Sequence, residues 1–546
     1  MSRVTDAVDG SEERVARARR GTVVTSHPRA VEAGVAALEA GGSAVDAAVA
    51  AACVLGVVDP MSTSLGGDCF AIVWDAAERT LHGFNGSGRA PALASADELR
   101  ARGLSEVPTR GWASVTVPGA LDAYARLLER FGRRTLSDAL APAIVAAREG
   151  FEVTPVVARD WAAAREVLEA GEGTTGFSTR SAGSAADFLP APRAGERFRH
   201  PALAASLAAI AEGGVDVFYR GAIAERIDAA SRAAGGWLRR EDLAAHAGEW
   251  VVPLEGWYRG HPIYELPPNG QGVVVLEALA LLEEHPLADL DEVARTHLQI
   301  EALKLAFADA FEHVGDPDRS DVLRLLDPVY LEGRGATLQS FAERANDAPR
   351  TGLPRDLAKG GDTVYVSVVD ADGNACSLIA SIYEHFGSAI AVDGIVLQNR
   401  GALFVLDDAH PSALAPGRRP YHTILPAMVF RHDAPWLVFG VVGGYQQPQA
   451  QVQLLVRTID LGESIVDAVK APRFRWLEGS RVRLEAGVSR EVVEGLRARG
   501  HSIVEADAHG GFGGAQAIAL EPEGTLGASD PRKDGVVGQT RERVEA

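Results

Sequence analysis

Residues whose types and order could do chemistry stand at one junction, where a polar segment rich in Gly and Pro, 345–362, runs directly into a strand-like stretch headed by Thr363. A hydroxyl is a poor nucleophile at neutral pH and needs a nearby base. A Thr that begins a polypeptide has such a base in its own α-amine, whose ordinary pKa lies near 8. Cleavage after Asp362 would therefore create an N-terminal nucleophile, and the Gly-Gly-Asp run gives the exposure that cleavage needs. The alternative is that Thr363 is only a β-branched residue that opens a strand.

Other familiar catalytic and ligand-binding motifs are absent from the sequence. It contains no GxSxG elbow, HExxH, Walker loop or well-placed GxGxxG. The glycine cluster at 510–514 has the wrong spacing and no preceding strand, so we expect a flexible loop there. Asp316 and Asp318, in GDPD, are more typical of a turn than of a cation site.

The three cysteines also argue against metal and redox chemistry. Cys53, Cys69 and Cys376 form no CxxC pair and no zinc pattern. Each is flanked by apolar or small residues, so we expect buried small hydrophobes rather than disulfides or reactive thiols. No motif calls for a cofactor, and we expect neither a cofactor nor a metal.

Composition and charge narrow the class of protein. The chain has 546 residues, of which 47% are hydrophobic, so it can bury a large core. Its 54 basic and 74 acidic residues give a net charge of -20, which argues against nucleic-acid binding. Residues 1–20 read as a mobile leader without the apolar core of a secretory signal. The longest apolar stretch, 47–58, is too short to span a bilayer, so we expect a cytoplasmic protein with no membrane partner.

The elements that must position Thr363 follow from hydrophobic periodicity. TVYVSVVD, a DADGNA turn and CSLIASIY predict a β-hairpin that begins at Thr363. Helices are predicted from Pro28 to about Ala40 and from Ser43, as N-cap, to about Leu55. Residues 115–310 read mainly as helices, and the part after 362 reads as rich in strands. Further elements are expected as strands at IVLQNR, AMVFR and WLVFGVV, and as helices at Gln449–Leu461, Ser464–Lys470 and Arg490–Arg499. The pattern predicts a layered α/β sandwich and leaves its topology open.

Ten stretches along the chain form a collinear set: GTVVTSHPRAVEAG, GGSAVDAAVAAACVLGVVDPMSTSLGG, VTVPGA, DVFYRG, LPPNGQG, EALKLAFADA, TVYVSVVDADGNA, VVGG, APRFR and GASDPR. Together they resemble the gamma-glutamyltransferase family of N-terminal nucleophile (Ntn) hydrolases. The resemblance covers Gly21 to about Gly535 and implies a four-layer αββα sandwich with additional helices in a large subunit. It also implies a precursor that cuts itself into a large subunit, 21–362, and a small subunit, 363–546. The two would stay together as an intertwined heterodimer, and a higher oligomer is left open.

The resemblance assigns the catalytic roles residue by residue. Thr363 takes the place of the nucleophile, and Asp362–Thr363 that of the autoprocessing bond. Gly443 and Gly444, in FGVVGGYQQ, match a glycine pair whose backbone N–H groups stabilise the oxyanion. Ser381, on the second strand of the hairpin, matches a hydroxyl that forms a hydrogen bond with the nucleophile.

Departures from the family pattern lie mostly where a γ-glutamyl substrate would bind. Tyr383 stands where the family has an Asn, and Arg400 and Leu403 stand where it has a Gln and an acidic residue. Losing the acidic partner of an α-ammonium and gaining an Arg favours an anion, because a guanidinium matches a carboxylate bidentately. These departures resemble the branch that contains oxamate amidohydrolase and cephalosporin-acylase-like proteins. The residues expected to bind substrate are Arg89, Tyr383, Asn399, Arg400, His422 and Thr423.

These observations predict an autoprocessed amidohydrolase that cleaves an amide bond of a small carboxylated substrate through an acyl-enzyme. One alternative is an authentic gamma-glutamyltransferase or glutathione hydrolase with a rebuilt α-amino site. Another is an unprocessed scaffold that only binds small anions. For Arg400 and His422, a purely structural role is the competing interpretation.

Overall fold

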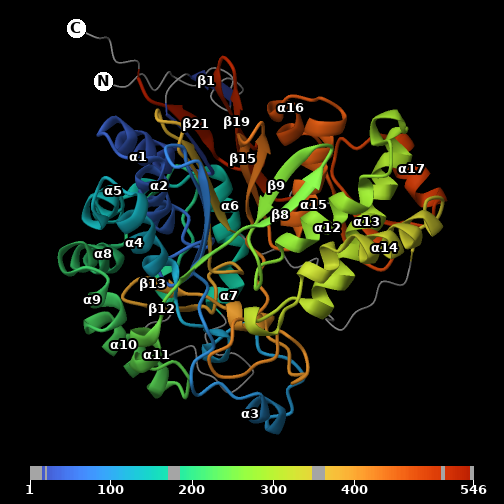
Figure 1. Cartoon of the computed structure of the whole chain (residues 1–546). Helices are drawn as coiled ribbons and strands as arrows, with labels where there is room; N and C mark the ends of the chain where they lie inside the picture. The colour runs from blue at the N-terminus through green and yellow to red at the C-terminus, as the bar shows by residue number, and fades with distance from the viewer. Residues whose placement is uncertain (1–14, 19–20, 170–184, 347–362, 506–510, 542–546) are drawn as a thin grey trace.

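The computed structural model describes residues 15–18, 21–169, 185–346, 363–505 and 511–541. The protein is of the mixed α/β class, as the sequence predicts (Figure 1). Its α-helices are α1 (Pro28–Glu39), α2 (Ala44–Val58), α3 (Ala96–Ala101), α4 (Ala120–Phe131), α5 (Leu136–Glu149), α6 (Pro155–Ala163), α7 (Arg165–Glu169), α8 (Pro201–Gly213), α9 (Asp216–Tyr219), α10 (Ala222–Ala233), α11 (Arg240–Ala245), α12 (Gly272–Leu282), α13 (Glu292–His313), α14 (Pro328–Ser340), α15 (Gln446–Leu455), α16 (Ile465–Lys470) and α17 (Arg490–Ala498).

Most of the strands belong to two seven-stranded antiparallel sheets. Sheet I is formed by β21 (Val536–Gln539), β2 (Thr22–Thr25), β10 (Val364–Val369), β11 (Ala375–Ser381), β3 (Asp68–Asp75), β4 (Thr80–Asn85) and β7 (Glu249–Val251), in that order. Sheet II is formed by β1 (Val15–Ala18), β20 (Gly524–Ser529), β19 (Gly514–Glu521), β15 (Ala434–Val442), β14 (Pro426–Arg431), β9 (His261–Glu265) and β8 (Leu254–Tyr258). Smaller sheets contain β5 (Phe151–Glu152), β6 (Arg197–Phe198), β12 (Ile390–Val392), β13 (Ile395–Leu397), β16 (Phe474–Glu478), β17 (Arg481–Leu484) and β18 (Ser502–Glu505).

The centre of sheet I is the predicted hairpin. Strands β10 and β11 pair from Val364 opposite Ala380 to Val369 opposite Ala375, so the hairpin is confirmed. Its turn is an Asx turn, because the Asp370 carboxylate accepts the N–H groups of Asp372 at 2.9 Å and of Asn374 at 3.0 Å. Thr363 therefore lies at the start of a central strand.

Sheet II contains two features that sequence patterns did not reveal. The hairpin of β8 and β9 interrupts the stretch 115–310 that reads mainly as helices. At the opposite edge, β1 pairs with β20, so four residues of the expected leader form a strand. The rest of that segment, 1–14 and 19–20, lies outside the described residues.

Strand β18 precedes the glycine cluster at 510–514, contrary to expectation, and Gly514 begins β19.

Helices α1 and α2 pack on sheet I (Figure 1). Helix α2 is buried almost all round, as predicted, and the predicted cap is confirmed. Ser43 accepts the Asp46 N–H, and the Asp46 carboxylate accepts the Ser43 N–H in return. The same carboxylate accepts the N–H groups of Arg133 and Arg134, so it also fixes the connection between α4 and α5.

Helices α12, α15 and α16 pack on sheet II, and α13 packs on α12. In Figure 1 the helices α12 to α17 lie on the opposite side of the strands from α1, α2, α4 and α5. A third apolar cluster, which includes Phe70, Tyr365, Met428, Val438 and Ile518, joins strands of sheet I to strands of sheet II. The two sheets therefore pack face to face around apolar side chains.

Glu277, in the middle of α12, is a buried carboxyl group with a measurable consequence for stability. Neither of its carboxyl oxygens has a hydrogen-bond partner in the described part of the chain, and burial raises its pKa to about 8 from the ordinary 4.5. Between these pH values the folded protein holds a proton that the unfolded chain has lost. The free energy of unfolding therefore falls as pH rises, by up to about 1.4 kcal/mol per pH unit.

We expect Glu277→Gln to remove this pH dependence. Its urea-unfolding midpoint should exceed that of the wild type at pH 8 and differ little at pH 5. Glu332→Gln, an exposed change on α14, is the matched control and should shift neither midpoint. Equal effects of Glu277→Gln at both pH values would contradict a buried, protonated carboxyl.

Among the described residues, no single helix is both long and apolar enough to cross a bilayer. The helices over 201–213 and 216–233 meet the length and composition criteria only as a pair, and they are bent by 117° relative to each other.

Candidate active site

Thr363 lies buried at the start of β10, with only 2% of its surface exposed. Its Oγ1 donates a hydrogen bond to Ser381 Oγ at 3.1 Å. The contact follows from the register of the hairpin, since Val364 pairs with Ala380 and the next positions outward are Thr363 and Ser381. Asp362 lies outside the described residues, so the structure describes only the Thr side of the predicted cleavage site.

The Ser381 hydroxyl is fixed by a second donor. The backbone N–H of Tyr383 reaches Ser381 Oγ at 2.9 Å. Tyr383 adopts a φ of 78°, a left-handed conformation that is uncommon for a residue with a side chain. The turn after β11 therefore holds Ser381 Oγ in place, and Ser381 Oγ in turn orients the Thr363 hydroxyl.

Gly443 and Gly444 follow β15 directly and precede α15. Their φ values of 126° and 61° are positive, and a Cβ added at Gly443 would lie 3.0 Å from Gly513 Cα. Within the described residues, neither backbone N–H of the pair meets a hydrogen-bond acceptor. They are unpaired donors at the N-terminus of a helix, where the helix dipole also favours negative charge.

Gln271 connects this glycine pair to the predicted substrate residues. Its Nε2 donates to the Thr423 carbonyl at 2.7 Å and to the Gly444 carbonyl at 3.2 Å. Its Oε1 accepts the Tyr421 hydroxyl at 2.9 Å. Sequence reasoning passed over Gln271, although it lies in LPPNGQG; a polar residue at the start of an apolar helical stretch was the available signal.

Arg400 is a fully buried cation with unused hydrogen-bond donors. Its Nη1 donates to Thr423 Oγ1 at 2.8 Å, and its Cζ lies 4.7 Å from the centre of the Tyr383 ring. Nε and Nη2 have no hydrogen-bond partner among the described residues. Burial lowers the pKa of Arg400 to about 10, so the side chain stays charged at neutral pH. Nε–H and one N–H of Nη2 lie parallel along one edge of the planar guanidinium, so they could bind two oxygens of one carboxylate; these two unpaired donors are called the open fork below.

His422 lies next to this arginine but has both ring nitrogens occupied. Its Nε2 lies 3.0 Å from Asp68 Oδ2, and its Nδ1 accepts the Ile424 N–H at 3.4 Å. Burial, together with the charge of Arg400, lowers the pKa of His422 to about 3. The neutral ring therefore donates to Asp68, and the structure gives it a protein partner where we expected a substrate contact.

Asp68 is a second residue that sequence reasoning missed. It lies on β3 directly opposite Ser381. Its carboxylate accepts the Gly88 N–H and Gln398 Nε2, both at 2.9 Å, besides the His422 ring. It is also the carboxylate that most favours the charged form of Arg400. The GGD run at 66–68 was the only local signal.

Two other predicted substrate residues have structural contacts. The Asn399 side chain accepts the Glu384 N–H at 3.1 Å and donates to the Thr109 carbonyl at 2.7 Å. Arg89, which is partly exposed, donates to Glu249 at 2.6 Å and to the Gly417 carbonyl at 3.0 Å. Asn399 thus ties two loops together, and Arg89 belongs to a separate ion pair.

Continuous contacts join the remaining predicted residues. They lead from Thr363 through Ser381 and Tyr383 to Arg400, then through Thr423 and Gln271 to Gly444. The site combines a hydroxyl at a strand start, unpaired N–H donors and a buried cation.

One cluster among the described residues has the residue types and spacing that could bind a metal ion. The ligand atoms of His297, Glu301 and His501 lie within 4.8 Å of one another. However, Lys304 Nζ lies 2.7 Å from Glu301 Oε1, and the two imidazole rings bond each other at 2.8 Å. The carboxylate already has a cation, so the cluster is better explained as a structural link between α13 and the chain near 341–346.

The cysteines and the GDPD turn behave as the sequence predicts. All three cysteines are buried and free, and burial raises the pKa of Cys53 to about 12. Asp316 caps a short 3-10 helix and accepts the Arg419 N–H at 2.7 Å. The cysteines are therefore buried as predicted, and the GDPD segment forms the predicted turn.

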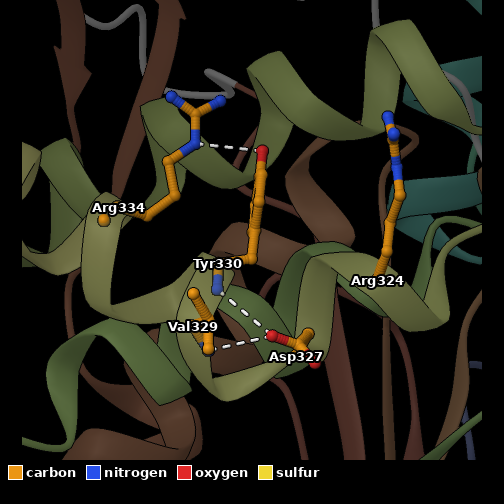
Figure 2. A pocket seen from close by; sticks show the side chains of 6 residues that line it. Arg324, Asp327, Val329, Tyr330 and Arg334 are labelled. Atoms are coloured by element: carbon orange, nitrogen blue, oxygen red, sulfur yellow. Dashed lines mark hydrogen bonds between the residues drawn. The ribbon is translucent and has the colours of Figure 1, made fainter.

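A surface hollow over α14 lies apart from these residues (Figure 2). Its polar groups are engaged in local structure: Asp327 caps the helix, and Arg334 donates to the Tyr330 hydroxyl at 3.2 Å. The residues that line it are Arg324, Asp327, Val329, Tyr330, Gly333 and Arg334. None of them contacts the arrangement around Thr363.

Known proteins match this chain over most of its length. A family model described as Gamma-glutamyltranspeptidase matches residues 30–540. The glutathione hydrolase-like YwrD proenzyme of Bacillus subtilis (strain 168) is 37% identical over 527 residues, covering 94% of this chain and 97% of the relative. The oxamate amidohydrolase proenzyme of Klebsiella pneumoniae is 37% identical over 538 residues, with coverage of 94% and 97%. The crystal structure of cephalosporin acylase from Bacillus halodurans matches with a TM-score of 0.90 at 40% identity, covering 100% of both chains.

Proposed function

The chain belongs to the gamma-glutamyltranspeptidase family of hydrolases, and from this premise we propose that it is an autoprocessed N-terminal-threonine amidohydrolase acting on a small carboxylated amide. The observation that supports the proposal most directly is the hydrogen bond from Thr363 to Ser381 at the start of β10. The similarity to an oxamate amidohydrolase and to acylases supports hydrolysis of an amide.

Processing would use the same hydroxyl as turnover. Thr363 Oγ attacks the carbonyl carbon of Asp362, and the acyl group moves from the Thr363 nitrogen to its oxygen. Water then hydrolyses the ester, which leaves a free α-amine on Thr363 and a carboxylate on Asp362. The products are a large subunit, 1–362, and a small subunit, 363–546, in an αββα arrangement in which sheets I and II are the central layers.

In turnover, Thr363 Oγ attacks the amide carbonyl of the substrate while the α-amine takes the hydroxyl proton. The amine passes this proton to the leaving nitrogen, and the acyl group remains on Thr363 as an ester. Water attacks the ester, the amine takes its proton, and the acid leaves with Oγ–H restored. The unpaired N–H donors of Gly443 and Gly444 are suited to stabilising the oxyanion in both steps.

The open fork of Arg400 supports the choice of substrate class. A buried cation without an anionic hydrogen-bond partner loses hydration on folding, and a carboxylate with two oxygens would restore two charge-assisted bonds. The third nitrogen of the guanidinium, Nη1, is bonded to Thr423, and this bond fixes the orientation of the fork. Leu403 stands where the family has an acidic residue, so this position offers no negative charge to balance a substrate ammonium.

Intact mass and activity together test the proposal. Under denaturing conditions the purified protein should give two fragments whose masses sum to the precursor plus one water, with Thr363 at one N-terminus. Ammonia release should be faster from succinamate than from butyramide, which lacks the carboxylate. An active single polypeptide would refute the mechanism.

Two alternatives lead to different results. A glutathione hydrolase with a rebuilt α-amino site would release p-nitroaniline rapidly from γ-glutamyl-p-nitroanilide and would prefer it to succinamate. An unprocessed scaffold that binds small anions would give one uncut band on a denaturing gel. The unpaired N–H groups at Gly443 and Gly444 favour catalysis over the scaffold.

Gly443→Ala should lower kcat for succinamate by about 10²–10³-fold with little change in KM, because an oxyanion donor would be displaced. The displacement follows from the φ of 126° and the contact with Gly513. Gly462→Ala is the matched control, since Gly462 has a φ of 66° with open space around it. Wild-type kcat in Gly443→Ala would remove the glycine pair from the mechanism.

A further inference from the structure

The loop that follows Ser381, residues 382–389, is held in an unfavourable backbone conformation. Tyr383, Phe386 and Ala389 have φ values of 78°, 55° and 60°, in the left-handed region that side chains disfavour. Such conformations persist only where surrounding contacts hold them, and they concentrate at functional sites. The contacts that hold this loop are therefore informative.

Arg110 supplies several of these contacts. Its Nη1 donates to the His385 carbonyl at 2.8 Å and also to the Gly387 carbonyl, and its Nη2 lies 2.9 Å from Glu384 Oε2. The neighbouring Gly111 N–H adds a bond to the Ser388 carbonyl at 2.9 Å. One planar guanidinium thus fixes three consecutive parts of the loop, which a flexible ammonium cannot match.

The loop in turn supports both halves of the site. The Tyr383 N–H bonds Ser381 Oγ, the partner of Thr363, and the Tyr383 ring lies against Arg400. A shift of the loop would therefore move the nucleophile's partner and the aromatic face beside the open fork together. None of the described contacts of Arg110 reaches Thr363 directly. Its effect on Thr363 would therefore pass through the loop and Tyr383.

We infer that Arg110 is a positioning residue, which sets Tyr383 so that Ser381 and Arg400 take their working orientations. The inference rests on the proposed function. Arg110 belongs to the segment 21–362 and the loop to 363–546, so after cleavage this contact would join the two subunits. A residue far from Thr363 in sequence would thereby control both processing and turnover.

The test compares Arg110→Met with Arg259→Met. Arg259 is a matched control, because its guanidinium, like that of Arg110, binds backbone carbonyls and a carboxylate. Its side chain is 25% exposed, against 23% for Arg110. For each variant we would measure processing by intact mass over time, kcat and KM for succinamate and butyramide, and the urea midpoint.

Arg110→Met should slow processing and lower kcat for both amides by about 10²-fold, since small misplacements have effects of this size. Its KM should rise for succinamate and not for butyramide. Arg110→Lys should recover part of the loss. Arg259→Met should lower the urea midpoint but keep the wild-type rates.

Wild-type rates in Arg110→Met, or equal losses in Arg259→Met, would overturn the inference while leaving the proposed function intact. An unprocessed or inactive wild type would instead refute the proposed function, and this inference with it. If Arg110→Met is insoluble, Glu384→Gln serves in its place, because it removes one contact of the guanidinium. It should produce a smaller loss with the same selective rise in KM.

Discussion

Thr363→Ala is expected to remain one full-length polypeptide and to lose amidase activity by at least about 10⁴-fold. Both effects have one cause, since the proposed processing and turnover steps use the same oxygen. The hydrogen bond from Thr363 Oγ1 to Ser381 Oγ would also disappear. Intact mass under denaturing conditions and ammonia release from succinamate measure the two effects separately.

Two companion variants separate chemistry from folding. Ser367→Ala removes another buried hydroxyl from the same face of β10, one that donates to the Val438 carbonyl at 2.7 Å. The Ser367→Ala variant should be processed and active, because the Ser367 hydroxyl is not part of the site around Thr363. Thr363→Ser keeps a hydroxyl and should be slow but measurable in both steps. A processed Thr363→Ala protein would show that another group attacks the bond after Asp362.

Arg400→Met is expected to lower kcat/KM for succinamate by about 10²–10³-fold, equivalent to about 3–4 kcal/mol of lost binding to the transition state. The value for butyramide should change little, because that amide has no carboxylate for the fork. We expect the variant still to be processed, since Thr363, Ser381 and the glycine pair are unchanged. Arg400→Lys should recover little, because an ammonium lacks the bidentate geometry.

The same variant should be more resistant to urea than the wild type. Burial lowers the pKa of Arg400 to about 10, which means that the fold disfavours its charge. Removing that charge relieves the penalty, whereas removing a purely structural arginine would destabilise the protein. Loss of stability together with unchanged selectivity would support the structural interpretation of Arg400.

Local features of the site followed from the sequence. Thr363 at the head of a strand, the hairpin of β10 and β11, and the Ser43 cap of α2 each depend on residues within a few positions of one another. Periods of 2 and 3.6, turn residues and capping side chains encode such features directly. The glycine pair and Arg400 were recognised through the family resemblance.

The sequence by itself thus determined the order of the main elements and the strand that begins at Thr363. Only the tertiary structure decided that His422 bonds Asp68, 354 positions away, and that Gln271 bonds Thr423, 152 positions away. The tertiary structure likewise brought Arg110 into contact with the loop after Ser381 and placed β9 beside β14. These pairings depend on how two sheets and their helices pack, and because packing joins residues from distant segments, no local pattern of residues encodes them.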